Sequence, residues 1–163
     1  SELRKNDNPI IAQLGEDQLN ASFIADGYHL SPEILKVYLR AKCSERVILI
    51  TDATAGASAA PGRYRLGALE LVLGSDPVIY DQQTSRPVGS AVTLDQCVRN
   101  VMRWYGISLE VAINWAAVNP QKILSTSQAA KFLAESERHV WWKEEKDGWE
   151  VKAVQSGKYF YTA

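Results

Sequence analysis

The sequence predicts an α/β fold in which parallel strands are covered by helices. Two short apolar runs occur at residues 23–25 and 47–50. Asp26 follows the first run directly, and Asp52 lies two residues after the second. Continuous apolar runs are typical of strands that are buried on both faces, as in parallel sheets packed between helices. A helical pattern lies between the two runs, so the order strand, helix, strand predicts a parallel βαβ unit.

The connecting helix is expected over residues 31–42. Ser31 can cap it, Pro32 suits the first helical position, and Glu33 suits the positive end of the helix. An apolar stripe follows at helical spacing, formed by Ile34, Leu35, Tyr38 and Leu39. A weaker helical pattern precedes the first strand and begins at Pro9.

The chain after Asp52 reads "ATAGASAAPG", a run of small residues whose length predicts a lid or a wall of a site. Residues 63–74 and 76–83 alternate and carry turn signals, which predicts short antiparallel strands. Two helices are expected next. The first starts with a capping-box pattern of Thr93 and Gln96 and closes at Gly106, and the second runs from Ser108 to a stop before Pro120.

The last strands are expected within residues 139–161. Polar and apolar residues alternate there around the turn sequence "KDG", which predicts a hairpin followed by a third strand.

Composition and charge exclude several function classes. The 163 residues are 46% hydrophobic and 23% charged, as in an ordinary globular protein with a core. Eighteen basic residues balance nineteen acidic ones, so no net field attracts nucleic acid or an anionic membrane. No apolar run approaches the roughly 20 residues of a membrane span, and the first residues do not resemble a signal peptide. We therefore expect a cytoplasmic protein with no membrane or nucleic-acid partner.

The cysteine and histidine residues do not form a recognisable metal motif. Cys43 and Cys97 lack ligand-like spacing, and we expect free thiols, with a disulfide left open. A hydrolytic zinc site uses three or more ligands, whereas the chain has two histidines, His29 and His139. We expect His139 to be a surface or packing residue. Glycine spacing fits neither common phosphate-loop motif, so nucleotide binding is disfavoured.

Candidate catalytic residues follow the two apolar strands. His29 and Asp52 are expected at the carboxyl ends of neighbouring parallel strands, the edge at which α/β proteins bind ligands. An aspartate there can act as general base and acid on a water molecule, and a histidine can hydrogen-bond a substrate oxygen. The alternative is structural: Asp52 caps the next turn or pairs with an arginine.

Several motifs occur together along the chain: ADGxH, an apolar strand followed by TDA, GxYxLG, GSxxT and NPxxxL. Their order and spacing resemble the carboxyl-terminal half of the N-acetylglucosamine-6-phosphate deacetylases, a family of the amidohydrolase superfamily. The resemblance runs from about Asn8 to Leu124. It implies the last part of a (β/α)8 barrel over residues 1–124, with the last two barrel strands, their helices and a short β insertion at about 63–82. Residues 125–163 would supply trailing strands of a small β-sandwich, although a clear GxxADL stretch is missing before them.

The resemblance also implies a reaction, hydrolysis of N-acetylglucosamine 6-phosphate to glucosamine 6-phosphate and acetate. Asp52 would carry a proton from a metal-bound water to the departing amine. The metal would be zinc or iron, and its ligands, a glutamate and two histidines, would lie before Ser1. Asp52 alone is left open as a ligand from this chain.

Substrate contacts implied by the resemblance are spread along the chain. His29 would contact the substrate, Arg4 or Lys5 would hold the phosphate, and the backbone of Gly89, Ser90 and Ala91 would line the sugar site. We expect the isolated chain to be inactive, and to associate with the missing amino-terminal half of the barrel or with a second copy. Two alternatives remain: a non-catalytic fragment or degenerate module, and an amidohydrolase that acts on another amide.

Overall fold

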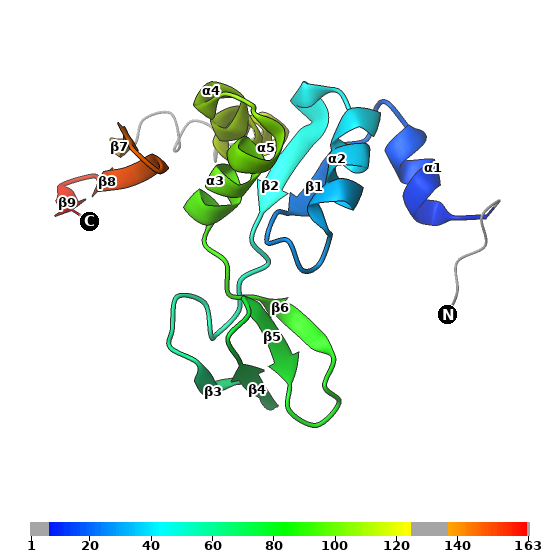
Figure 1. Ribbon diagram of the computed structural model, residues 1–163, viewed down its shortest axis with the longest axis vertical. Coiled ribbons are helices and arrows are strands. Elements are labelled where there is room, and N and C mark those ends of the chain that lie inside the picture. Colours follow the sequence, from blue (N-terminus) through cyan, green and yellow to red (C-terminus); the bar gives the residue numbers. More distant parts are fainter. Residues whose placement is uncertain (1–6, 125–136, 163) are drawn as a thin grey trace. The chain divides into compact units, whose positions relative to one another are not determined.

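The structure is a computed structural model that describes residues 7–124 and 137–162. Its elements are shown in Figure 1. In chain order they are α1 (Pro9–Gly15), β1 (Ala21–Ile24), α2 (Pro32–Ala41), η1 (Ser44–Arg46), β2 (Val47–Ile50), β3 (Gly62–Leu66), β4 (Leu69–Leu73), β5 (Val78–Asp81), β6 (Pro87–Ser90), α3 (Leu94–Tyr105), α4 (Leu109–Ile113), η2 (Asn114–Val118), α5 (Asn119–Leu124), β7 (Arg138–Glu145), β8 (Gly148–Ser156) and β9 (Tyr159–Thr162). The chain divides into two compact units, Ser1–Asn119 and Pro120–Ala163.

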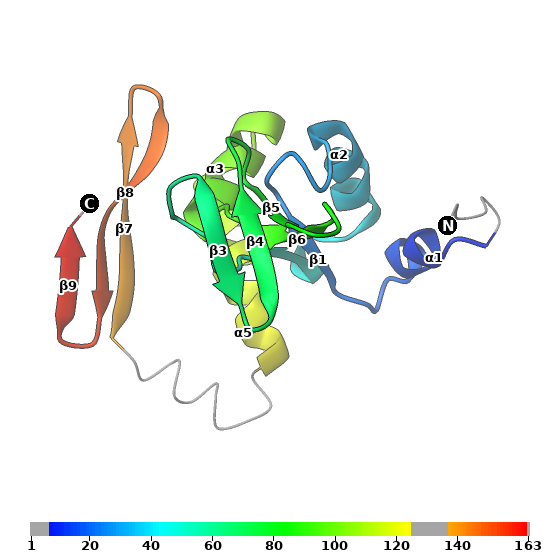
Figure 2. The same cartoon turned by 90° about the horizontal axis from the view of Figure 1, so that it is seen from below.

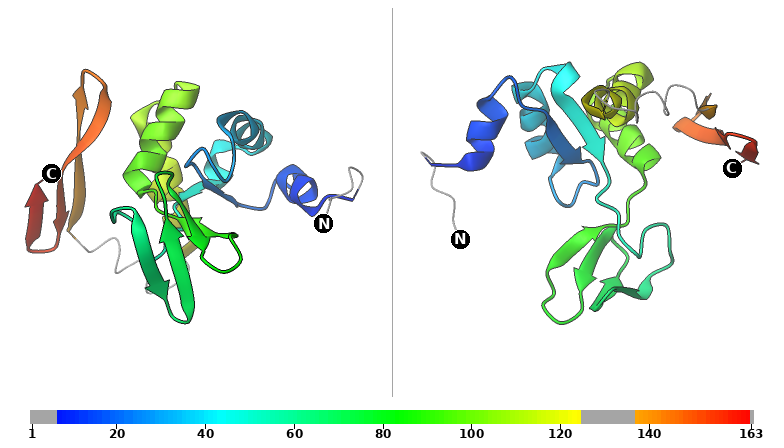
Figure 3. Two further views of the ribbon diagram at one scale, coloured as in Figure 1. Left: turned by 60° about the horizontal axis from the view of Figure 1, so that its bottom comes forward. Right: turned by 180° about the vertical axis from the view of Figure 1, so that it is seen from behind.

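The first unit contains the predicted βαβ arrangement. Strands β1 and β2 pair in parallel, from Ala21 opposite Val47 to Ile24 opposite Ile50, and α2 connects them. Figure 3 shows the two strands side by side from behind. The Ser31 hydroxyl caps α2 as expected, and Leu35 is fully buried. Other positions of the predicted stripe are less buried than expected, since Ile34 is 47% exposed.

A four-stranded antiparallel sheet follows, in the order β3-β4-β5-β6 (Figure 2). Its small core consists of Leu71, Leu73 and Ile79, with Tyr64, Val88 and Ala91 packed against it. The predicted antiparallel strands are therefore present. The sheet also includes β6, because Ala91 N–H donates to the Pro77 carbonyl (2.8 Å) and holds the end of β6 beside β5. The antiparallel sheet therefore extends to Ser90, beyond the predicted end of the insertion at about residue 82.

Helix α3 buries the face that carries Cys97, Val98 and Val101 and ends at Gly106, as predicted. The predicted capping box is wrong, because the Thr93 side chain makes no capping hydrogen bond. The Gln96 amide instead donates to the Asn100 side chain (2.9 Å). The Gln96 side chain therefore extends toward the next turn of the helix and does not bond back to the first residue of the cap.

The helix that begins after Ser108 does not stop before Pro120. It passes through the π-helical segment η2 and continues as α5 to Leu124. An ordinary helix cannot accommodate an interior proline, which lacks an N–H group and collides with the carbonyl of the preceding turn. The π turn lies just before Pro120, at the place where a proline is expected to distort the helix. Asn119 anchors this region by donating from Nδ2 to the carbonyls of Ser44 and Val47, both at 2.8 Å.

The second unit contains the predicted hairpin and third strand. Strands β7, β8 and β9 form an antiparallel sheet in sequence order, with a bulge between Trp141 and Trp142. The Trp141 and Phe160 rings lie 5.3 Å apart between centroids, and Lys152 forms ion pairs with Glu145 and Glu150. In the described parts of both units, no helix is long and apolar enough to cross a membrane.

Candidate functional site

Two aspartates occupy equivalent places at the carboxyl edge of the β1–β2 pair. Ile24 and Ile50 are the last residues paired across the two strands. Asp26 and Asp52 each follow two residues later. Neighbouring strands lie about 4.8 Å apart, so the two segments leave the sheet close together and at the same edge. This is the edge at which the sequence placed His29 and Asp52.

Asp26 is a buried anchor for the turn that carries His29. Its side chain has no solvent exposure. One carboxylate oxygen, Oδ1, accepts the backbone N–H groups of Tyr28 and His29, both at 2.9 Å. The other oxygen, Oδ2, lies 2.6 Å from Nδ1 of His29, whose side chain is 24% exposed. The carboxylate therefore holds both the backbone and the imidazole ring of the residue predicted to contact substrate.

Helix α3 supports the ends of both strands. The Asn100 side chain is buried, and its Nδ2 donates to the Ala25 carbonyl at 2.8 Å. The Cys97 thiol approaches the Ile50 carbonyl at 3.7 Å. Burial raises the pKa of this thiol to about 11. Cys97 is thus a neutral packing residue at ordinary pH, as expected from its lack of motif.

Asp52 differs from Asp26 in exposure and in backbone conformation. It is exposed, and its φ angle of 51° lies in the left-handed region. Such backbone is uncommon for residues other than glycine, and it recurs at functional sites. With the described residues, the Asp52 carboxylate makes neither a hydrogen bond nor an ion pair. The structural alternative, in which Asp52 caps a turn or pairs with an arginine, is not observed within those ranges.

Strand β6 holds the backbone of this strained residue. Ser90 N–H donates to the Asp52 carbonyl at 2.9 Å, and Thr54 N–H donates to the Ser90 carbonyl at 3.2 Å. Gly89 allows this close approach, since a Cβ atom there would lie 2.8 Å from the Asp52 carbonyl oxygen. The Thr54 hydroxyl is buried at this contact, and within the described ranges it has no partner.

The structure brings some of the predicted substrate residues together and separates others. Gly89 and Ser90 lie against the backbone of Asp52. Ala91 packs instead on the core of the β3–β6 sheet. Arg4 and Lys5 lie outside the described residues. Sequence reasoning did not select Asp26, although an aspartate directly after a strand, three residues before a histidine, is the pattern of a side chain that caps a turn.

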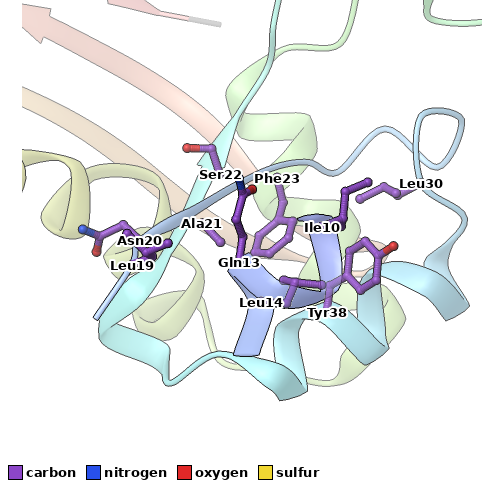
Figure 4. Close-up of a pocket in the computed structure, with 10 residues that line it drawn as sticks. All are labelled: Ile10, Gln13, Leu14, Leu19, Asn20, Ala21, Ser22, Phe23, Leu30 and Tyr38. Carbon is purple, nitrogen blue, oxygen red and sulfur yellow. The ribbon is translucent and has the colours of Figure 1, made fainter. Parts of the chain in front are cut away.

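A cavity of about 340 Å³ lies between α1, β1 and α2 (Figure 4). Figure 4 shows the Phe23 ring and the Leu14 and Tyr38 side chains along its wall. Among the described residues, its polar lining consists of neutral groups, including Gln13 and Ser22. None of the predicted site residues that the structure describes lines it.

The described residues do not form a cage for the expected metal. Among them, no group of three or more His, Cys, Asp or Glu side chains could hold an ion. Asp26 uses both oxygens in hydrogen bonds within its own turn, which leaves Asp52 as the one free carboxylate at this edge of the described sheet. One carboxylate is too few for a structural or catalytic zinc site.

The sequence is similar to known sugar-phosphate deacetylases. It is 32% identical over 124 residues to the N-acetylglucosamine-6-phosphate deacetylase of Bos taurus, covering 72% of this chain and 30% of the relative. It is 30% identical over 129 residues to the human protein of that name, covering 76% and 31%. A putative N-acetylgalactosamine-6-phosphate deacetylase of Escherichia coli K12 is 33% identical over 102 residues, which cover 62% of this chain and 59% of the relative. No family model matches the sequence.

Solved structures extend the similarity to almost the whole chain. The N-acetyl-D-glucosamine-6-phosphate deacetylase of Mycobacterium smegmatis superposes with a TM-score of 0.77 and 27% identity, covering 97% of this chain and 42% of that one. A variant of the same enzyme in complex with N-acetyl-D-glucosamine 6-phosphate gives a TM-score of 0.76 at 25% identity, covering 95% and 41%. The chain therefore spans less than half the length of these structures, and about a third of the length of the animal relatives.

Proposed function

Because this chain is homologous to the N-acetylglucosamine-6-phosphate deacetylases, as its motifs predicted, we propose that it supplies the proton-transfer residue of an amide hydrolase. The substrate would be N-acetylglucosamine 6-phosphate and the products glucosamine 6-phosphate and acetate. Since the chain spans less than half of the solved relatives, the proposal includes the remainder of a barrel as partner. The chain by itself is expected to be inactive.

The observation that carries the proposal is the carboxylate of Asp52, which has no partner among the described residues and lies at the same sheet edge as the Asp26–His29 pair. An exposed acid in a strained backbone, at the carboxyl edge of a parallel sheet, is positioned to meet a ligand. A carboxylate that is not committed to another protein group can accept and release a proton.

In the proposed mechanism, a water oxygen attacks the acetamide carbonyl carbon while Asp52 accepts a proton from that water molecule. Asp52 then gives the proton to the amine as the carbon–nitrogen bond breaks, so that acetate and the amino sugar leave. His29 makes a hydrogen bond to the substrate and orients the amide. The backbone at Gly89 and Ser90 lines the sugar site, with Ala91 next to it, and Arg4 or Lys5 neutralises the phosphate.

A divalent metal, zinc or iron, belongs to the proposal for the whole enzyme and would activate the attacking water when bound. The described residues do not supply its cage. We assign no step of this chain to it. We also propose a cytoplasmic location, in keeping with a phosphorylated sugar substrate, and association with a barrel partner or a second copy.

A second candidate substrate is N-acetylgalactosamine 6-phosphate. Two Escherichia coli proteins named as deacetylases of N-acetylgalactosamine 6-phosphate, one of them putative, are each 33% identical to the chain. This identity is as high as that of the relatives named N-acetylglucosamine-6-phosphate deacetylase. The two sugars differ in the orientation of one hydroxyl group. Relative kcat/KM for the two substrates distinguishes these candidates.

The test is acetate release by the protein that carries this sequence, purified from its source, together with its intact mass and metal content. Release from either sugar phosphate supports the proposal, and its absence favours the non-catalytic alternative. Asp52→Asn is expected to reduce kcat by about 10²–10⁴-fold. The matched control is Asp147→Asn in the β7–β8 turn, which should leave kcat unchanged. Full activity of Asp52→Asn would refute the assigned role.

A further inference from the structure

We infer that Asp26 is a positioning residue that sets the tautomer of His29, so that the ring carries its proton on Nδ1 and presents Nε2 to the ligand. The identity of that ligand rests on the proposed function, whereas the tautomer is a property of this chain alone. The inference starts from the burial and hydrogen bonds of Asp26.

The two oxygens of Asp26 have separate tasks. Oδ1 accepts two backbone N–H groups at 2.9 Å, from Tyr28 and His29, and so closes the turn. Oδ2 lies 2.6 Å from Nδ1 of His29. A carboxylate can only accept hydrogen bonds. Nδ1 must therefore be the donor, which places the single proton of a neutral ring on Nδ1 and leaves Nε2 with a lone pair.

The surroundings of the pair make this preference strong. The Asp26 side chain has no solvent exposure, so water does not compete for Oδ2. A carboxylate buried without a donor is costly, and the alternative tautomer would set the Nδ1 lone pair against it. We expect the Nδ1–H tautomer to exceed the other by about tenfold or more, since hydrogen bonds to charged groups are the strong ones.

The consequence for recognition concerns Nε2. The His29 side chain keeps 24% exposure although Nδ1 is engaged by a buried group. Nε2 then accepts a hydrogen bond from a ligand hydroxyl or amide when the ring is neutral, and donates one to an oxygen when the ring is protonated. Asn100 supports the turn that holds the ring, because its Nδ2 donates a hydrogen bond to the carbonyl of Ala25, the residue before Asp26.

Asp26→Asn tests the inference with little change in shape. The amide oxygen can keep both backbone hydrogen bonds, while the amide nitrogen replaces Oδ2 and can only donate. The substitution should therefore reverse the tautomer, moving the proton from Nδ1 to Nε2. A residue that only closes the turn would show no such reversal.

The measurement uses the full chain labelled with ¹⁵N and long-range proton–nitrogen correlation, well above the ordinary histidine pKa of about 6.5. The chain has two histidines, so His139, which contacts the Trp141 ring, serves as an internal control that should not change. We expect His29 to be predominantly the Nδ1–H tautomer in the unaltered chain and the Nε2–H tautomer in Asp26→Asn. Backbone amide shifts of residues 28 and 29 report whether the turn survives.

Predominance of the Nε2–H tautomer in the unaltered chain overturns the inference, even if the variant fails to fold. An unchanged tautomer in a folded Asp26→Asn overturns it as well. The outcome is separate from the proposed function: acetate release with the wrong tautomer refutes only the inference. The expected tautomer in a native protein that releases no acetate refutes only the proposed function.

Discussion

Gly89→Ala should destabilise the first unit and disturb the backbone of Asp52. The residue has a φ angle of 125°, which side chains rarely adopt. A Cβ atom there would lie 2.5 Å from Cγ2 of Thr54 and 2.8 Å from the Asp52 carbonyl oxygen. The second contact is with backbone and cannot be relieved by rotating a side chain, so β6 must move away from Asp52.

The magnitude has two parts. An unfavourable backbone conformation costs about 1–3 kcal/mol, and forced displacement of packed neighbours costs about 1–3 kcal/mol more. Gly67→Ala in the β3–β4 turn isolates the first part, because Gly67 also has a positive φ of 59° but has no atom within 4 Å of the added Cβ. Alanine in this conformation costs about 1–2 kcal/mol. Gly89→Ala should therefore exceed its control by about 1–3 kcal/mol.

The assay is urea unfolding, monitored by intrinsic tryptophan fluorescence, together with hydrogen exchange of single amides. The Ser90 and Thr54 N–H groups link β6 to the Asp52 segment. We expect them to exchange faster in Gly89→Ala and to be unaffected in Gly67→Ala. Equal free energies of unfolding for the two variants, with both amides still protected, would refute the close packing of β6 against Asp52.

Four further predictions follow from burial and exposure. Asn100→Ala leaves the Ala25 carbonyl buried without its donor and should lower the free energy of unfolding by about 1–3 kcal/mol, measured by urea unfolding against Gln96→Ala. Cys43 is exposed and should react with a thiol reagent at pH 8, whereas Cys97 should react only on unfolding. Because burial raises the pKa of Cys97 to about 11, stability from its neutral thiol is complete below pH 9 and is lost as the pH rises toward 11. Finally, several large hydrophobic side chains are exposed, so the chain alone should self-associate and bind a hydrophobic dye. A chain that is monomeric by light scattering in dilute buffer and does not bind the dye would contradict this.

Elements marked by local signals could be predicted from the sequence. The parallel pair, α2 with its Ser31 cap, and the β7–β8–β9 sheet each carry a pattern within a few residues. The errors occurred where a contact that the sequence motif does not include decides the outcome. The Gln96 side chain donates a hydrogen bond to Asn100 instead of completing the cap. A π-helical turn precedes Pro120, and the helix continues beyond it. Strand β6 depends on hydrogen bonds to β5 and to Asp52, which no local periodicity reveals.

The candidate site shows the same limit at the level of single side chains. The sequence presents Asp26 and Asp52 as two acids that each follow an apolar strand, and the structure places them at equivalent positions of one sheet edge. Their surroundings separate them. Asp26 receives three donors from its own turn and is committed to holding His29, while Asp52 is turned into left-handed backbone and left without a described partner. A carboxylate whose oxygens are not engaged by protein donors is free to meet a ligand and to accept and release a proton. The pair therefore divides into one carboxylate that orients and one that can react, and Asp26→Asn and Asp52→Asn should give different phenotypes: an altered histidine tautomer in the first, and loss of turnover with the tautomer unchanged in the second.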